Sequence, residues 1–226
     1  MPTGDGETQA GADLGPLPGG HHGLTREQVA ESQRERLLAA TAELIAERGF
    51  SEAPISEIVK RASVANRVFY ANFKGKEEAF IAAFDAIADH LAGLVAAANA
   101  EEGDWADQVV AALRTVLEFF DREPTLARFC LVAPFTATPK IAGHCRDSLA
   151  AAIPFLAEGR ALHRNGGELP ASTEDSLLGG VVSQLSRAAL AGSGSFVELL
   201  PDLAEFVLAP YLGARKARSL SSKLAK

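Results

Sequence analysis

Apolar and polar residues alternate with the 3.6-residue period of α-helices along most of the chain. The first clear stripe spans residues 34–48 and ends at Gly49, a residue that tolerates the left-handed backbone found at helix ends. A shorter stripe spans residues 54–62, and a third segment spans residues 65–72. The pattern therefore predicts three consecutive helices in the first third of the sequence.

The second and third of these helices are joined by Ser63 and Val64, which leave room only for a tight turn. Two short helices joined in this way make a helix-turn-helix. In the third helix the stripe turns Val68 and Phe69 inward, so that three polar or aromatic side chains face outward: Asn66, Arg67 and Tyr70.

Beyond Gly75 the apolar stripes predict only further helices and no sheet. The predicted segments are a long helix from residue 76, one from Asp104 to Pro124, and the ranges 125–132, 140–163 (split at Pro154), 173–191 and 196–213. With 47% hydrophobic residues the chain has ample material for a core. The predicted fold is all-α, with an N-terminal three-helix helix-turn-helix domain followed by a helical bundle.

The two ends of the chain lack this pattern. Residues 1–25 are rich in Gly, Pro and acidic residues and predict a disordered tail, because almost nothing there can be buried. Residues 215–226 predict a frayed basic tail. The expected division is therefore a helix-turn-helix domain at 26–75 and a helical effector-binding and dimerisation domain at 76–214.

Charge changes the picture at one place. The formal net charge is −7, yet residues 60–76 carry five positive charges and no negative one. Lys and Arg bind phosphates, and Arg and Asn read base edges, so a cationic stretch interleaved with Asn, Tyr and Phe favours a nucleic-acid surface. An ordinary solvated charge run is the alternative.

Residues 34–84, RERLLAATAELIAERGFSEAPISEIVKRASVANRVFYANFKGKEEAFIAAF, resemble the N-terminal DNA-binding domain of the TetR family of bacterial transcriptional regulators. The matching positions are Ala39–Ala40, Gly49–Phe50, Ile58, Ala62, Val64, the Tyr70–Asn72–Phe73 run where the family has Tyr-x-His-Phe, and Lys76–Glu77. The resemblance covers about fifty residues, and the remainder fits the family in length and helical character.

Three departures from the family pattern bear on DNA recognition. Ser63 stands where the family usually has Gly in the turn, and Ala65 stands where it usually has a Ser cap. Arg67 and Val68 replace the common Gly-Thr, which adds a cation and removes a hydroxyl. The resemblance thus implies an operator particular to this chain.

The resemblance implies a homodimeric repressor released from a pseudo-palindromic double-stranded DNA operator by a small apolar or aromatic effector. A cytoplasmic location is expected because the first residues lack the pattern of a signal peptide. No cofactor, metal or catalytic residue is expected, because no metal-ligand spacing or catalytic motif is present. The DNA-binding candidates are Ser56, Asn66, Arg67, Tyr70, Asn72, Lys74 and Lys76. The pocket candidates are Ile87, Leu91, Leu113, Val116, Phe120, Phe129 and His144. The dimer candidates, whose apolar surface exceeds what one subunit would cover, are Leu177, Leu178, Val181, Val182, Leu185 and Phe206.

Two alternatives stay open. One is a DNA-binding regulator without a small effector, controlled by a protein partner or by abundance, which a filled core would favour. The other is an enzyme or ligand carrier with a vestigial helix-turn-helix, but the sequence contains no nucleophile-elbow, phosphate-loop, dinucleotide or zinc-protease pattern. Cys130 and Cys145 are expected to be reduced packing residues. We also expect no membrane span, since no apolar run of about 20 residues stands out.

Overall fold

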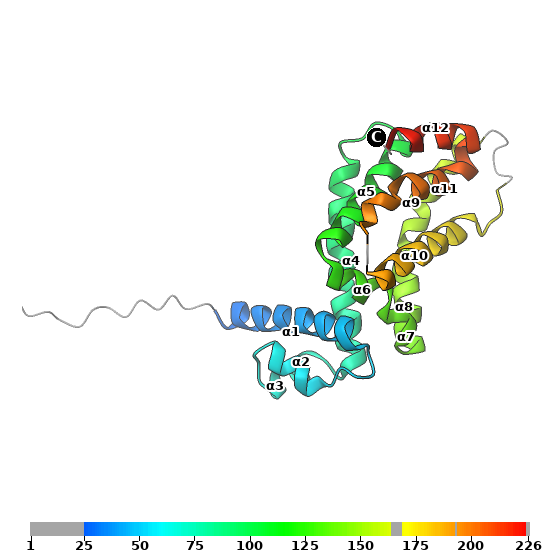
Figure 1. Cartoon of the computed structure of the whole chain (residues 1–226). Coiled ribbons are helices and arrows are strands. Elements are labelled where there is room, and N and C mark those ends of the chain that lie inside the picture. Colours follow the sequence, from blue (N-terminus) through cyan, green and yellow to red (C-terminus); the bar gives the residue numbers. More distant parts are fainter. Residues whose placement is uncertain (1–24, 164–168, 193, 225–226) are drawn as a thin grey trace, which may run out of the picture.

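The computed structural model describes residues 25–163, 169–192 and 194–224, and every regular element in those ranges is helical. The predicted all-α fold is confirmed. Three helices form an N-terminal unit, and α4 leads from it into a larger helical body (Figure 1). The α-helices are α1 Arg26–Arg48, α2 Ile55–Arg61, α3 Asn66–Asn72, α4 Lys76–Asn99, α5 Trp105–Arg122, α6 Pro124–Leu131, α7 Ala133–Thr136, α8 Pro139–Leu149, α9 Ile153–Ala157, α10 Thr173–Ala191, α11 Leu200–Leu212 and α12 Ala214–Leu224.

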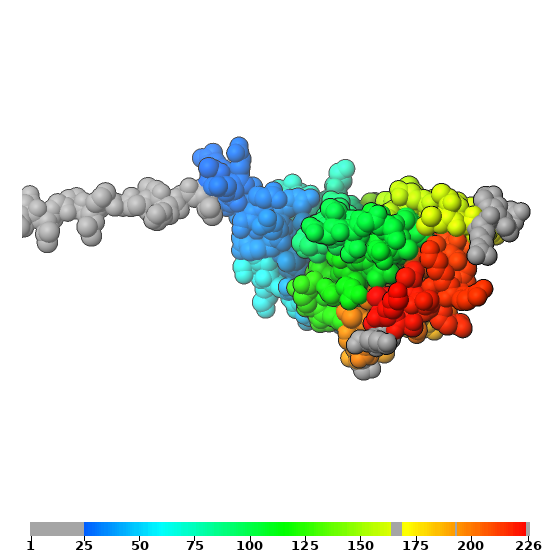
Figure 2. All heavy atoms as spheres, turned by 90° about the horizontal axis from the view of Figure 1, so that it is seen from above, coloured from blue at the N-terminus to red at the C-terminus, as the bar shows by residue number. Residues whose placement is uncertain are grey.

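Helix α1 begins eight residues before the predicted start because Thr25 and Gln28 form a capping box. The Thr25 hydroxyl accepts from the Gln28 amide at 3.1 Å, and the Thr25 amide donates to Oε1 of Gln28 at 2.8 Å. The first turns carry no buried side chain, and in Figure 2 they project from the rest of the molecule. The predicted tail at 1–25 lies outside the described residues, apart from Thr25.

The body follows most of the predicted segments. Asp104 caps α5 by accepting from the Asp107 amide at 3.0 Å, as predicted. The expected split at Pro154 occurs instead at Ala150, where a 3₁₀ turn separates α8 from α9. Pro154 lies in the first turn of α9, where its missing N–H removes no helical hydrogen bond.

The frayed basic end predicted for residues 215–226 is wrong, since residues 214–224 form helix α12. Ala217 and Ser221 of α12 are buried, and Leu220 packs beside α11. These three side chains, spaced i, i+3 and i+4, form a narrow amphipathic face made mostly of small residues, so its apolar signal in the sequence is weak. The basic side chains lie on the opposite face.

One hydrophobic core crosses the predicted boundary at residue 75. Phe80 of α4 is fully buried, with Phe50 of the α1–α2 loop at 6.1 Å and Phe129 of α6 at 4.5 Å between ring centroids. Side chains of α1, α2 and α3 belong to the same cluster as Ile141 and Cys145 of α8. The helix-turn-helix unit is therefore packed onto the body, and a shift of α4 or α6 would displace side chains in both parts.

Helix α4 also corrects the expectation about membrane spans. By length and composition alone it could cross a membrane, with a mean hydropathy of 1.6 over 18 residues. It is the one such helix within the described residues. In the folded chain Phe80 packs into the shared core, and Asp85 of α4 lies 2.6 Å from Nε2 of His144 on α8. These contacts place α4 between two parts of the folded protein.

A buried ion pair fixes the start of α10. Arg160 donates to both carboxylate oxygens of Glu174, at 2.8 and 2.6 Å, and the Tyr211 hydroxyl donates to Glu174 at 2.9 Å. Arg160 also donates to the carbonyls of Leu169 and Pro170, which ties down the segment before α10. The bonded Arg160 guanidinium holds the pKa of Glu174 below its usual value.

Acidification is expected to weaken this network. A carboxyl whose pKa is lowered by folding stabilises the folded state above its unfolded pKa of about 4.5, and this contribution is lost as the pH falls through the lower folded value. Urea unfolding from pH 7 to pH 3 should show a decline below about pH 4.5 that is smaller in Glu174→Gln. Glu102→Gln, an exposed carboxylate, is the control; an equal decline in Glu174→Gln and the native protein would contradict the assignment.

Candidate nucleic-acid interface

The helix-turn-helix consists of α2, the turn at Ser63 and Val64, and α3. Ser63 has a φ of 54°, and it is the one non-glycine residue with positive φ among the described residues. Ala65 precedes α3 and supplies no side-chain cap. The departure at Ser63 therefore appears as a left-handed turn residue, and the departure at Ala65 as a helix start without a side-chain cap. Phe69 anchors α3, since it is fully buried and packs edge-on against Phe73 at 5.5 Å.

The outer face of this motif presents most of the predicted DNA-binding residues. Ser56, Asn66, Arg67 and Tyr70 are exposed, and Tyr70 retains 61% of its accessible surface. Tyr70 also packs edge-on against Phe69 at 5.4 Å, which holds its ring in place. A guanidinium, an amide and a hydroxyl thus stand together on one short helix, which suits contacts to base edges and phosphates.

Asn72 is partly withdrawn from this face. Its side-chain amide donates to the Val68 carbonyl at 2.8 Å, so one of its donors is already used inside α3. Lys74 follows α3, is exposed, and has its backbone amide bound to Glu78 at 2.7 Å. Its ammonium remains available to a phosphate.

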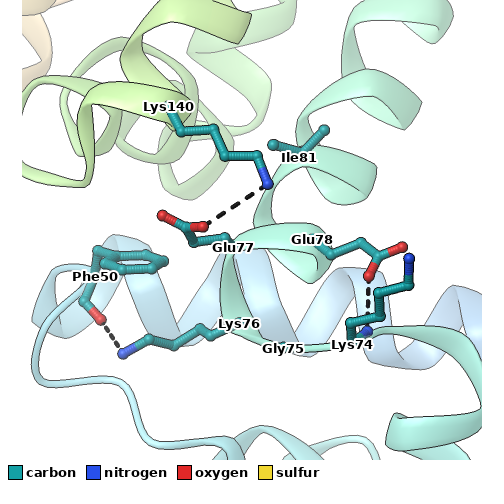
Figure 3. A pocket seen from close by; sticks show the side chains of 8 residues that line it. All are labelled: Phe50, Lys74, Gly75, Lys76, Glu77, Glu78, Ile81 and Lys140. Carbon is teal, nitrogen blue, oxygen red and sulfur yellow. Dashed lines mark hydrogen bonds and ion pairs between the residues drawn. The ribbon is translucent and has the colours of Figure 1, made fainter.

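Lys76 does not fit its predicted role as a phosphate contact. Its ammonium donates to the carbonyls of Phe50 and Ser51, and it lies 4.5 Å from the centre of the Phe50 ring (Figure 3). Partial burial lowers the pKa of Lys76. The side chain therefore fastens the start of α4 to the α1–α2 loop. This contact spans 26 residues, so local sequence could not reveal it.

The other four cations of residues 60–76 are either paired within the protein or exposed without an ion pair. Arg61 forms a bidentate pair with Glu47 at 2.7 Å and so joins α2 to α1. Within the described residues no ion pair involves Lys60, Arg67 or Lys74. Three of the five positive charges are thus free for a polyanion, including Lys60, which is not among the predicted DNA-binding residues.

Lys74 and Lys76 should separate in a salt titration. Lys74→Ala is expected to shrink the log–log salt slope of DNA binding by about 2 for a dimer, because each lost phosphate contact changes it by about 0.9. Lys76→Ala should leave the slope nearly unchanged and lower the melting temperature. Fluorescence anisotropy with a labelled duplex, at salt concentrations from about 50 to 300 mM, measures the slope. Thermal unfolding measures the melting temperature. A slope reduced equally by both substitutions would show that Lys76 contacts a phosphate after all.

A hollow of about 500 Å³ lies where α4 begins, between the α1–α2 loop and α8. Figure 3 shows Lys140 of α8 reaching to Glu77, with the nitrogen 3.8 Å from the carboxylate. Glu77 also accepts from the Thr138 hydroxyl at 2.5 Å. Two polar contacts therefore fasten the start of α8 to the first turn of α4.

The predicted pocket residues line neither the hollow at α4 nor a second one of about 340 Å³ near Arg114. Phe129 is fully buried in the core shared with the helix-turn-helix, and His144 pairs with Asp85 of α4; a pocket role for either stays a prediction. The remaining five border the core between α4 and α5, where Phe120 is buried and four are partly buried: Ile87, Leu91, Leu113 and Val116.

The predicted dimer residues also divide. Leu177 and Leu185 are buried inside the subunit, with 5% and 3% of their surface exposed, so they are not available to a partner. Leu178, Val181 and Val182 are partly buried, and Phe206 remains 39% exposed. The Phe206 ring lies against Gly180, where an added Cβ would stand 2.6 Å from Cζ. A reduced set of apolar side chains therefore remains at the α10–α11 surface.

The fold and the exposed helix-turn-helix define a helical DNA-binding protein with a large second helical part. Residues 37–83 match the family model described as bacterial regulatory proteins, tetR family. The N-terminal domain is therefore similar to the DNA-binding domain of TetR-family transcriptional regulators.

Two curated relatives are also named as transcriptional regulators of the helix-turn-helix type. The chain is 33% identical over 99 residues to the uncharacterized HTH-type transcriptional regulator YdgC of Bacillus subtilis, covering 42% of this chain and 51% of the relative. It is 26% identical over 116 residues to the HTH-type transcriptional activator FasR of Mycolicibacterium smegmatis, covering 51% and 53%. The chain thus spans about half the length of the curated relatives it matches.

A solved structure extends the likeness to the whole fold. The transcriptional regulator FadR of Bacillus subtilis, in complex with stearoyl-CoA, matches with a TM-score of 0.67 and 16% identity, covering 78% of this chain and 98% of that chain. At this identity the match supports the fold alone. Most of this chain therefore shares the helical arrangement of that regulator.

Proposed function

We propose that the chain is a homodimeric repressor that binds a pseudo-palindromic operator and leaves it when a small apolar effector binds the C-terminal body. The observation that carries the DNA-binding part is the exposed face of α3, where Asn66, Arg67 and Tyr70 stand together beside the free cation of Lys74. Two such faces related by a twofold axis would enter successive major grooves about 34–36 Å apart. Cytoplasmic location follows from this role.

The dimer proposal rests on the α10–α11 surface. Phe206 and Leu190 retain 39% and 61% of their accessible surface, and Val182, which lies on α10 like Leu190, is partly exposed. Exposed apolar side chains on two adjacent helices are typical of a surface that a second subunit covers. The two helices would pair with those of the partner in a four-helix bundle.

Sedimentation equilibrium at micromolar concentration is expected to give twice the chain mass of 23.7 kDa. Phe206→Asp should shift the species toward the monomer, because a charge would be buried in the interface. Phe135→Asp is the matched control, since Phe135 is an exposed phenylalanine on α7 and belongs to neither helix of the proposed interface. A native protein of monomer mass would contradict both the bundle and the paired half-sites.

The effector proposal rests on the half-buried apolar side chains between α4 and α5. Ile87, Leu91, Leu113 and Val116 border the C-terminal core without being sealed into it. Contacts already exist that would carry a displacement to the DNA-binding unit. Phe129 stacks on Phe80, and Arg128 of α6 donates to the Ala46 carbonyl at the end of α1, at 3.4 Å.

A regulator without a small effector is the second candidate. It is supported by the observation that Ile87, Leu91, Leu113 and Val116 line neither the hollow at the start of α4 nor the one near Arg114. Thermal-shift measurements with stearoyl-CoA and a panel of apolar and aromatic metabolites, followed by operator-binding titrations, separate the candidates. Under our proposal at least one compound raises the melting temperature and lowers operator affinity. Stabilisation with unchanged operator affinity, or no stabilisation by any compound, supports the second candidate.

A further inference from the structure

The turn of the helix-turn-helix has the hydrogen bonds of a Schellman motif. The Ser63 amide donates to the Lys60 carbonyl, and the Val64 amide donates to the Val59 carbonyl, both at 3.1 Å. Val64 packs against the core, as the residue after such a motif commonly does. Ser63 therefore occupies the left-handed position that glycine normally fills, and its φ of 54° is unfavourable for a residue with a Cβ.

The motif leaves two carbonyls without a partner in the turn, and a side chain from another helix reaches them. Nη1 of Arg36 on α1 lies 3.1 Å from the Ala62 carbonyl and 3.4 Å from the Ser63 carbonyl. Its Nε lies 3.4 Å from the Ser32 carbonyl within α1, which orients the guanidinium. The positive charge also lies at the C-terminal end of α2, where the helix dipole favours a cation.

We propose that Arg36 is a positioning residue for the recognition helix, which offsets the strained turn at Ser63 and fixes the direction in which α3 leaves α2. Helix α3 depends on this support because it has only seven residues and no side-chain cap at Ala65. Phe69 fixes its depth in the core, whereas the turn fixes its angle. This inference rests on the proposed DNA-binding function.

The test is a double-mutant cycle of Arg36→Ala and Ser63→Gly in the full-length protein. The probes are a duplex selected by the native protein from a random library and an unrelated duplex of equal length. Arg36→Ala is expected to weaken binding of the selected duplex about tenfold, as loss of a charged hydrogen bond does. Binding of the unrelated duplex and the salt slope should stay within about twofold and within about 0.5, because no phosphate contact is lost.

Repeating the Arg36→Ala change in the Ser63→Gly protein tests whether Arg36 acts through the strained turn. With glycine at position 63 the turn is no longer strained, so the same Arg36→Ala change should weaken selected-duplex binding by less than about threefold. Arg36→Lys should restore part of the loss in the serine background, since an ammonium can still donate to both carbonyls. Arg26→Ala, which removes a charge from the exposed first turn of α1, is the matched control and should leave both duplexes unaffected.

Three results would overturn the proposal: equal losses in the serine and glycine backgrounds, equal losses for both duplexes, or a salt slope reduced by about 2 per dimer, which would make Arg36 a phosphate contact. Thermal unfolding of the same four proteins gives a second cycle that needs no DNA. If the native protein binds no duplex selectively, the proposed function fails, and the unfolding cycle still decides whether Arg36 and Ser63 are coupled. Additive melting-temperature changes would then refute the coupling.

Discussion

Phe129→Ala is expected to lower the free energy of unfolding by about 3–5 kcal/mol, the usual cost of removing a fully buried aromatic ring. Phe129 has no exposed surface, and its ring centroid lies 4.5 Å from that of Phe80. Because Phe80 also contacts Phe50 of the α1–α2 loop, the cavity would open between the body and the DNA-binding unit. Operator binding should therefore fall even at temperatures where the protein remains folded.

Urea unfolding at fixed protein concentration measures the first effect, and Phe135→Ala is its control. Phe135 retains 70% of its accessible surface, so the same truncation there should change the free energy by less than about 0.5 kcal/mol. A loss below about 1 kcal/mol at Phe129, or equal losses at both positions, would show that the core does not continue from α4 into α6.

Arg67→Ala is expected to cost about 1–3 kcal/mol of operator-binding free energy per half-site and to relax the preference at one symmetric base pair. Arg67 is exposed near the start of α3, and no ion pair within residues 25–163 occupies its guanidinium. A free guanidinium can make two parallel hydrogen bonds to O6 and N7 of guanine. Neighbouring Asn66 could contact adenine in the same groove.

Selection of duplexes from a random library with the native protein and with Arg67→Ala measures this effect. Lys74→Ala is the matched control, because a phosphate contact weakens binding uniformly over all sequences. If Arg67→Ala also weakens all sequences alike and no base position loses its preference, Arg67 contacts the backbone and the specificity assignment is wrong.

The helix-turn-helix could be predicted from the sequence because its signals are local. The apolar stripes of residues 34–48 and 54–62 end where the structure ends α1 and α2, within about one residue, and Ser63 marks the turn. The start of α1 was missed although Thr25 and Gln28 form a visible capping pattern, since no apolar stripe accompanies it. Helix α12 was missed because its buried face is made largely of small residues.

The roles of individual side chains depended on contacts that no local pattern contains. Lys76 reads as a phosphate contact by its position at a helix start, yet the loop 25 residues earlier takes its ammonium. Leu177 and Leu185 share an apolar stripe with Val182, but the pattern does not show whether the subunit's own core or a second subunit covers each side chain. Arg36 and Arg128 carry no sequence signal, because their partners are backbone carbonyls of other helices.

Selection from a random duplex library with the native full-length chain tests whether α3 is a recognition helix. Sequences with two inverted half-sites whose centres are about 10 base pairs, or a multiple of this, apart should be enriched. Each half-site should carry at least one strongly preferred base pair that depends on Arg67. Recovery of sequences no different from the starting library would contradict the assignment of α3 as a recognition helix.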